Sequence, residues 1–261
     1  TSGPGATNLI TGIACSYFDS IPTIHITGQV NQKEKIPFKG AKVRQAGFQE
    51  TNIVDLVKPI TKYAVKVNSV EELRMELAKA YSIALEDRKG PVLIDVPMDV
   101  QQEEVNDEML MPELALEHFD FDVCKTTINN FFKDSNQPLV LLGAGPGLSD
   151  QSEEVIEWLA LNSIPFVSSW NGMCFIKSDN KNYYGNIGVY GNRGANFILQ
   201  SCDKLLVLGS RLDNRQRGSD VDKFAPRADV LVIDVDEEEL KKHLNEPRYR
   251  IQKFNFKFSK D

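Results

Sequence analysis

Three glycine-rich turns are the segments of this sequence best suited to binding an anion. Thr1–Asn8 contains a Gly-Pro-Gly turn just before a helical pattern, while Gly143–Gly147 and Gly209–Arg215 each follow an apolar strand pattern. Glycine lets the backbone approach a ligand closely, and the N–H groups at the start of a helix attract negative charge. The third turn adds two arginines and an aspartate, which suit a phosphate or pyrophosphate.

Each turn also has a simpler interpretation. The glycines of Gly143–Gly147 serve equally well in a tight strand–helix turn without a ligand, and the charges of Gly209–Arg215 in an ion-pair network. A later strand pattern ends at Asp234, whose carboxylate suits either a ribose hydroxyl or the backbone of the next helix. Gly143–Gly147 lacks the G-x-G-x-x-G spacing, and Ser168–Trp170 stand where the ribose-binding acid is expected, so both features count against a nicotinamide dinucleotide site.

The composition is that of an ordinary globular protein of 261 residues, with 41% hydrophobic and 26% charged residues. Its net charge of −7 and its lack of a Lys/Arg-rich block count against nucleic-acid binding. We expect no membrane association, because no apolar stretch approaches the ~20 residues that span a bilayer. The four cysteines form no C-x-x-C pair and the three histidines are scattered, so we expect reduced thiols, a cytoplasmic location and no metal cluster.

Strand and helix patterns alternate in two blocks. In the first block the strand patterns cover 22–27, 60–67 and 91–96, and the helical patterns cover 6–19 and 69–85. In the second block the strand patterns cover 138–142, 165–169, 204–208 and 229–235, and the helical patterns cover 151–161, 192–200 and 237–244. Apolar strands that alternate with helices predict parallel sheets covered on both faces. The predicted fold class is therefore α/β, with two Rossmann-like, doubly wound parallel-sheet units.

An acidic stretch without a clear period separates the two blocks. We expect a first domain at 1–100, a linker at 101–124 and a second domain at 125–261.

The motifs of both blocks, taken in order, resemble the thiamine-diphosphate-dependent acetolactate synthase family. The segments that carry the resemblance are Thr1–Asn8, Ile26–Gln29, Gly47–Thr51, Gly90–Pro97, Gly209–Arg215 and Ile233–Asp236. The resemblance implies that 1–100 is the later part of a pyrimidine-binding domain, incomplete at its N-terminus, and that 125–261 is a central domain of the FAD- or nucleotide-binding type. It also implies an activating glutamate upstream and a Mg²⁺- and diphosphate-binding motif downstream, so the segment alone is expected to be inactive.

The resemblance assigns roles to individual residues. Pro4, Gly5 and Asn8 would line the pyrimidine and thiazolium region of thiamine diphosphate. Gln49 would orient the hydroxyl of the reaction intermediate, and Phe48 would wall the substrate channel, unless Phe48 is a plain core residue. The positions that match flavin contacts are Arg88, Gly143, Ala144, Gly145, Gly209, Arg211, Asp213, Arg215 and Asp234. For Arg88 the simpler interpretation is a solvated cation at a helix end.

The activity implied by the resemblance is decarboxylation of a 2-keto acid such as pyruvate, with transfer of the acyl carbanion to a second carbonyl. The cofactor supplies this chemistry, and the protein supplies orientation and excludes water. The resemblance further implies a homodimer or homotetramer.

Some segments depart from the family pattern: a longer basic loop between Gln29 and Phe48, Trp170, and Gly188–Gly191. They favour a paralogue with another acceptor, such as a keto-sugar. From other classes, a nicotinamide-dependent oxidoreductase and a non-catalytic nucleotide-binding module remain as alternatives.

Overall fold

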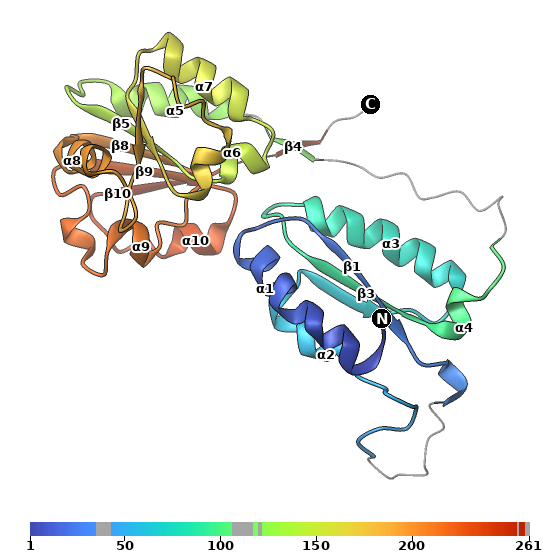
Figure 1. Cartoon of the computed structure of the whole chain (residues 1–261). Coiled ribbons are helices and arrows are strands. Elements are labelled where there is room, and N and C mark those ends of the chain that lie inside the picture. Colours follow the sequence, from blue (N-terminus) through green and yellow to red (C-terminus); the bar gives the residue numbers. More distant parts are fainter. Residues whose placement is uncertain (35–42, 106–116, 120–121, 255, 259–261) are drawn as a thin grey trace. The chain divides into compact units, whose positions relative to one another are not determined.

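The computed structural model describes residues 1–34, 43–105, 117–119, 122–254 and 256–258. The chain divides into two compact units, here called the first unit (Thr1–Glu117) and the second unit (His118–Phe258), which are shown in Figure 1. Much of the predicted linker at 101–124 lies outside the described residues. Each unit is described by itself.

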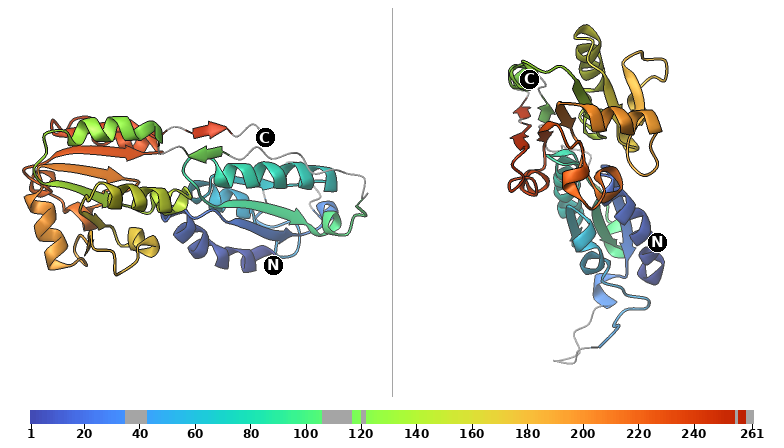
Figure 2. Two further views of the ribbon diagram at one scale, coloured as in Figure 1. Left: turned by 90° about the horizontal axis from the view of Figure 1, so that it is seen from above. Right: turned by 90° about the vertical axis from the view of Figure 1, so that its left-hand side faces the viewer.

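The first unit is built on a three-stranded parallel sheet in the order β1-β3-β2. Its strands are β1 (Ile24–Gln29), β2 (Tyr63–Lys66) and β3 (Val92–Pro97). Helix α3 (Val70–Leu85) covers one face, and α1 (Ile10–Phe18) and α2 (Ile53–Val57) cover the other (Figures 1 and 2).

The central strand β3 explains why helices cover both faces of this sheet. Val92, Ile94 and Val96 pack against α3, whereas Leu93 packs against α1 and α2. Every residue of β3 is buried, in agreement with the continuous apolar pattern at 91–96. The shorter elements of the unit are η1 (Gly3–Leu9), η2 (Gln32–Glu34), η3 (Lys58–Ile60) and α4 (Met98–Gln101).

Helix α3 begins where the sequence predicts it. The Ser69 hydroxyl accepts a hydrogen bond from the backbone N–H of Glu72 at 3.2 Å. The Glu72 carboxylate accepts from the backbone N–H of Asn68 at 2.8 Å, one residue before the N-cap. The helix predicted at 6–19 is also present, but its first part is the 3₁₀ helix η1, and the α-helical geometry begins only at Ile10.

The second unit is built on a six-stranded parallel sheet in the order β10-β9-β8-β5-β6-β7. Its strands are β5 (Pro138–Leu142), β6 (Phe166–Ser168), β7 (Tyr183–Asn186), β8 (Lys204–Leu208), β9 (Asp229–Asp234) and β10 (Tyr249–Lys253). The chain runs outward from β5 in one direction and then from β8 in the other. The carboxyl ends of β5 and β8 therefore form the switch point where ligands bind in sheets of this type.

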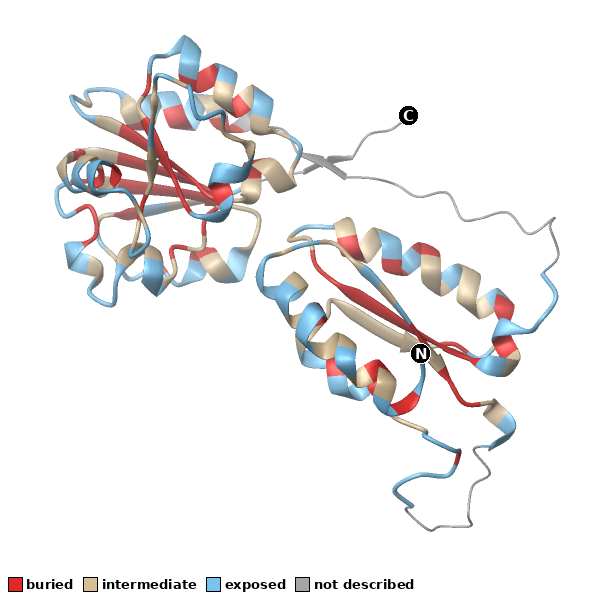
Figure 3. Cartoon of the chain, viewed as in Figure 1, coloured by how far each residue is buried: buried red, intermediate tan, exposed pale blue. Residues whose placement is uncertain are grey.

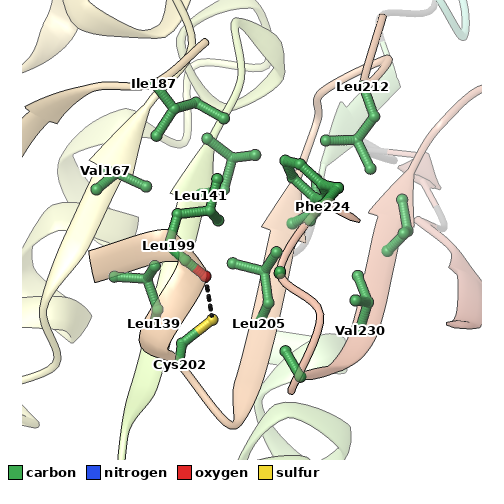
Figure 4. Packing of buried hydrophobic residues seen from close by; sticks show 14 of the residues in the cluster. Leu139, Leu141, Val167, Ile187, Leu199, Cys202, Leu205, Leu212, Phe224 and Val230 are labelled. Carbon is green, nitrogen blue, oxygen red and sulfur yellow. Dashed lines mark hydrogen bonds between the residues drawn. The ribbon is translucent and has the colours of Figure 1, made fainter. Parts of the chain in front are cut away.

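Two hydrophobic cores lie on opposite faces of this sheet, because successive strand residues point to opposite sides. Leu139, Leu141 and Val207 pack against α8 (Arg193–Ser201), in the core drawn in Figure 4. Val140 packs on the other face against α5 (Asp122–Phe132) and α7 (Ser152–Leu161). Figure 3 shows the buried strands at the centre of each unit. The remaining elements are α6 (Gly145–Leu148), η4 (Asn171–Phe175), α9 (Asn214–Arg217), η5 (Val221–Lys223), α10 (Glu237–Lys241) and the pair β4 (Glu117–Phe119) and β11 (Phe256–Phe258).

The four cysteines are free thiols. Cys202 is a core residue whose thiol donates a hydrogen bond to the Leu199 carbonyl at 3.1 Å (Figure 4). Burial, together with the nearby Asp203 carboxylate, raises the pKa of the Cys202 thiol to about 12, so this side chain stays protonated and unreactive. None of the helices among the described residues is long and apolar enough to traverse a lipid bilayer.

His243 makes the stability of the second unit dependent on pH. Its ring is 1% exposed and stacks on Tyr249 at 5.0 Å, and neither ring nitrogen has a hydrogen-bond partner among the described residues. Burial, and then the positive charges of Lys242 and Arg217, lower the pKa of His243 to about 4. Because the unfolded chain binds this proton more readily, stability should fall as the pH drops from 6.5 towards 4.

We expect His243→Phe to remove this part of the pH dependence, since phenylalanine keeps the stacked ring and does not titrate. At pH 4 the wild-type penalty from this histidine is up to about 3 kcal/mol. Urea unfolding of both proteins at pH 7.5 and pH 4.5 measures it, and the wild type should lose more stability than the variant. Equal losses would contradict a buried neutral His243.

Candidate functional site

The Gly-Pro-Gly turn and the segment that carries Gln49 pack directly against each other. Gly3 has a φ of 60°, and a β-carbon built on it would lie 2.1 Å from the backbone carbonyl oxygen of Gln49. Only glycine permits this approach of one backbone to the other. Gln49 itself has a φ of 58°, in the left-handed region that glutamine rarely occupies. The fold therefore brings the predicted pyrimidine-lining turn and the predicted catalytic glutamine together.

The side chains of this site are presented outward from the first unit. Pro4, Asn8 and Gln49 are exposed and Gly5 is half-buried. Phe48 is 79% exposed, so its interpretation as a plain core residue is wrong. A large aromatic ring beside polar side chains offers one apolar wall and several hydrogen-bonding groups, a combination that suits a partly apolar heterocyclic ring.

The Gln49 segment is held by its own polar groups. The Glu50 carboxylate accepts from the backbone N–H groups of Ala46 and Gly47 at 3.2 and 3.1 Å. The side-chain amide of Gln45, with its oxygen turned toward them, accepts from the N–H groups of Gln49 at 2.6 Å and Glu50 at 3.0 Å. Such bonds impose the strained backbone of Gln49, and strain of this kind gathers at functional sites.

Two buried polar residues behind this segment received no role in the sequence analysis. Asp95 is 1% exposed, and its carboxylate accepts from the Gln29 side-chain amide at 2.9 Å. Gln29 also donates to the Thr51 carbonyl at 2.8 Å. The signal in the sequence is an aspartate in the middle of an apolar strand.

Arg88 lies at the other edge of this sheet. It precedes β3, and its Nε donates to the Ser20 hydroxyl at 2.9 Å, ahead of β1. The Gln49 segment lies by contrast at the carboxyl ends of these strands, next to Gln29. Arg88 is half-buried and hydrogen-bonded rather than a fully solvated cation. It belongs to the first unit, whereas the other eight predicted flavin positions belong to the second.

The two glycine turns at the switch point of the second unit interlock. The Gly143 N–H donates to the Leu208 carbonyl at 2.8 Å, and the Gly145 N–H donates to the Gly209 carbonyl at 3.1 Å. A β-carbon on Gly143 would overlap the Gly209 carbonyl oxygen at 1.9 Å, and Gly209 has a φ of 56°. Ala144 lies between the two and forms the N-cap of α6. Backbone packing alone therefore requires these glycines, and their contact with a ligand stays a prediction.

Three of the four charged residues predicted near this switch point have partners within the chain. The Asp213 carboxylate caps α9 by accepting from the Arg215 N–H at 2.7 Å, and the Asp234 carboxylate accepts from the Asp236 N–H at 3.0 Å. The Arg215 guanidinium donates to the Tyr190 hydroxyl at 2.6 Å. Arg211 is half-buried, and its guanidinium has no hydrogen-bond or ion-pair partner within the described parts of the chain.

Two exposed aromatic rings lie beside these charges. Trp170 follows β6 and Tyr190 follows β7, and their rings meet edge to face at 6.5 Å. The Arg215 guanidinium lies over the Tyr190 ring at 5.5 Å. Exposed rings at the carboxyl edge of a parallel sheet suit stacking against a planar ligand. The same residues are among the departures from the family pattern noted in the sequence.

Both units match the sequence patterns of one enzyme family. Residues 1–56 match the N-terminal TPP-binding domain of thiamine pyrophosphate enzymes, and residues 126–253 match their central domain.

Curated relatives align along nearly the whole chain. The acetolactate synthase isozyme 2 large subunit of Escherichia coli is 35% identical over 251 residues, which are 93% of this chain and 42% of that protein. The acetolactate synthase large subunit of Porphyra purpurea is 35% identical over 93% of this chain and 41% of its own length. The chloroplastic acetolactate synthase 2 of Nicotiana tabacum is 34% identical over 93% of this chain and 36% of its own length. The chain thus spans about two fifths of the length of these relatives, and with both its units matched it belongs to the thiamine pyrophosphate enzyme family.

Proposed function

We propose that this chain is part of a thiamine-diphosphate-dependent carboligase of the acetolactate synthase type. Such an enzyme decarboxylates a 2-keto acid such as pyruvate and transfers the acyl unit to a second carbonyl. The observation that carries the proposal is Gln49, exposed and held with a positive φ against Gly3 of the Gly-Pro-Gly turn, in a chain that matches thiamine pyrophosphate enzymes. When bound, the cofactor supplies the carbanion chemistry.

The residues of the first unit fit one face of this cofactor. Pro4, Gly5 and Asn8 are proposed to hold its pyrimidine and thiazolium region. The Gln49 amide offers both a donor and an acceptor, with which it is proposed to orient a hydroxyl at the reaction centre. Phe48 is proposed to exclude water from the substrate channel. The diphosphate and its Mg²⁺ are proposed to bind outside this sequence.

A carboligation assay of the full-length protein tests this proposal. With pyruvate, Mg²⁺ and thiamine diphosphate present, we expect both CO₂ release and acetolactate. Neither product would contradict a pyruvate carboligase. Release of CO₂ with little acetolactate would point to another acceptor, such as a keto-sugar. The relatives named above are acetolactate synthases, so they favour the pyruvate reaction over that variant, over a nicotinamide-dependent oxidoreductase and over a non-catalytic module.

We further propose that the second unit binds FAD at its switch point. Support comes from the half-buried Arg211 guanidinium, which suits a diphosphate, and from the exposed rings of Trp170 and Tyr190, which suit a planar ring. Arg211→Gln should weaken FAD binding about tenfold, the effect of losing one charge-assisted hydrogen bond. Arg227→Gln is the matched control, because Arg227 is exposed and lies ahead of β9, at the opposite edge of the sheet. Flavin fluorescence on titration measures both affinities, and equal affinities would contradict a role for Arg211.

The proposed assembly is a homodimer or homotetramer in the cytoplasm. The four free cysteines are consistent with a reducing compartment. Light scattering of the full-length protein after size-exclusion chromatography tests the oligomeric state, and a monomeric mass would contradict it.

A further inference from the structure

Asp95 is a carboxylate placed where burial is most costly. It lies in β3, the central strand of the first unit, between Ile94 and Val96, and is 1% exposed. A buried carboxylate is tolerated only when other groups satisfy its oxygens, and an apolar residue is often the more stable choice. The position therefore calls for a use other than stability alone.

Both carboxylate oxygens of Asp95 accept from β1. The Thr27 hydroxyl donates to Oδ1 at 2.7 Å, and the Gln29 amide Nε2 donates to Oδ2 at 2.9 Å. Thr27 and Gln29 are themselves buried, and Thr27 lies directly opposite Asp95 in the strand pairing. The network is thus closed to water, where hydrogen bonds are strong and a lost partner is costly.

The Gln29 amide extends this network to the segment that carries Gln49. Its Nε2 also donates to the backbone carbonyl of Thr51 at 2.8 Å, and its Oε1 accepts from the Val30 N–H at 3.1 Å. A primary amide has two N–H donors, and here one binds Asp95 and the other binds Thr51. The amide orientation is therefore fixed, because a flipped amide would place a donor against the Val30 N–H.

We infer that Asp95 and Gln29 are positioning residues for Gln49. Asp95 orients the Gln29 amide, the amide holds the Thr51 carbonyl, and the segment Gly47–Thr51 is thereby kept with Gln49 at a positive φ against Gly3. A strained residue persists only where its surroundings over-determine it, and this buried link is one such restraint. The functional part of this inference rests on the proposed role of Gln49, whereas the structural part does not.

Amide hydrogen exchange of the whole chain separates this role from a purely structural one. Gln29→Met keeps the volume of the side chain but removes its bonds to Asp95 and Thr51. Thr27→Val is the matched control, since it also removes one bond from Asp95 but leaves the Gln29–Thr51 link intact. We expect exchange at 46–51 to rise about tenfold in Gln29→Met, relative to the amides of β3, and to stay unchanged in Thr27→Val.

Asp95→Asn provides a second route to the same test if Gln29→Met folds poorly. Asparagine retains an oxygen for Thr27 but places an amide group against the fixed Gln29 amide, so it should also loosen 46–51. Equal acceleration in the segment and in β3, or no acceleration in the segment, would overturn the inference.

Turnover of the full-length enzyme tests the functional part. Gln29→Met should lower kcat more than it raises KM for pyruvate, and it should have little further effect in a Gln49→Gly background. Independent, multiplicative losses would overturn the coupling. A wild-type protein without carboligase activity would contradict the proposed function instead, and hydrogen exchange would still decide the positioning role.

Discussion

Gly143→Ala is expected to destabilise the second unit by about 3 kcal/mol or more, at the upper end of the overpacking range. The added methyl group would lie 1.9 Å from the Gly209 carbonyl oxygen, and its neighbours are backbone atoms that have no rotamer with which to move away. The Gly143 N–H is also held by the Leu208 carbonyl. A loss of this size is a large part of the 5–15 kcal/mol that stabilises a typical domain. Urea unfolding followed by circular dichroism measures it.

Gly194→Ala is the matched control. Gly194 lies within α8, and a β-carbon built on it meets no atom within 4 Å. Because alanine favours the helix, this variant should gain roughly 0.5–1 kcal/mol. If Gly143→Ala unfolded at the same urea concentration as the wild type, the interlocked arrangement of the two turns would be incorrect.

The same variant separates the two interpretations of the glycine turns. If these glycines existed only to admit a ligand, alanine would leave the unit stable and reduce nucleotide binding alone. The contacts between Gly143, Gly145 and Gly209 instead predict a loss of stability in the absence of any ligand.

The elements that the sequence predicts best are those buried on both faces of a sheet. The patterns at 138–142 and 204–208 coincide with β5 and β8, because central parallel strands are apolar throughout. Strands β7 and β10 went unrecognised. They are the outer strands of the sheet and carry polar residues, as in Tyr183–Asn186 and Tyr249–Lys253, so no strong pattern marks them.

The sequence also gave no sign of α2 or of the start of α5. Helix α2 has only five residues, too few to show a helical period. Helix α5 begins at Asp122, inside the stretch assigned to the acidic linker, so its first turn was grouped with the charged residues that precede it.

The candidate site was predicted as a set of residues, without the contacts that join them. The family resemblance named Gly5 and Gln49, but nothing in the residue types predicts that Gln49 adopts a positive φ, since glutamine has no preference for it. That conformation depends on Gly3, which is distant in sequence, and on the buried link through Gln29. Tertiary packing imposes it, and local propensity does not.

Gln49→Gly in the full-length enzyme is expected to lower carboligase turnover about 100-fold, the size of effect expected when a reacting group loses its orientation. Stability should change little. The φ of 58° costs a non-glycine residue about 1–2 kcal/mol, and glycine relieves this strain while adding about 0.5–1 kcal/mol of unfolded-state entropy. Steady-state formation of acetolactate and thermal melting of the same samples measure the two effects separately.

Gln49→Asn is the conservative control, because asparagine tolerates the left-handed backbone and keeps an amide that is shorter by one methylene group. We expect it to fold normally and to retain an intermediate turnover, since the amide remains but no longer reaches the same point. Full activity in Gln49→Gly would exclude a catalytic role for this side chain. A glycine variant with low turnover and unchanged melting would instead locate the loss in the amide itself, because its backbone keeps the conformation that Gly3 and Thr51 impose.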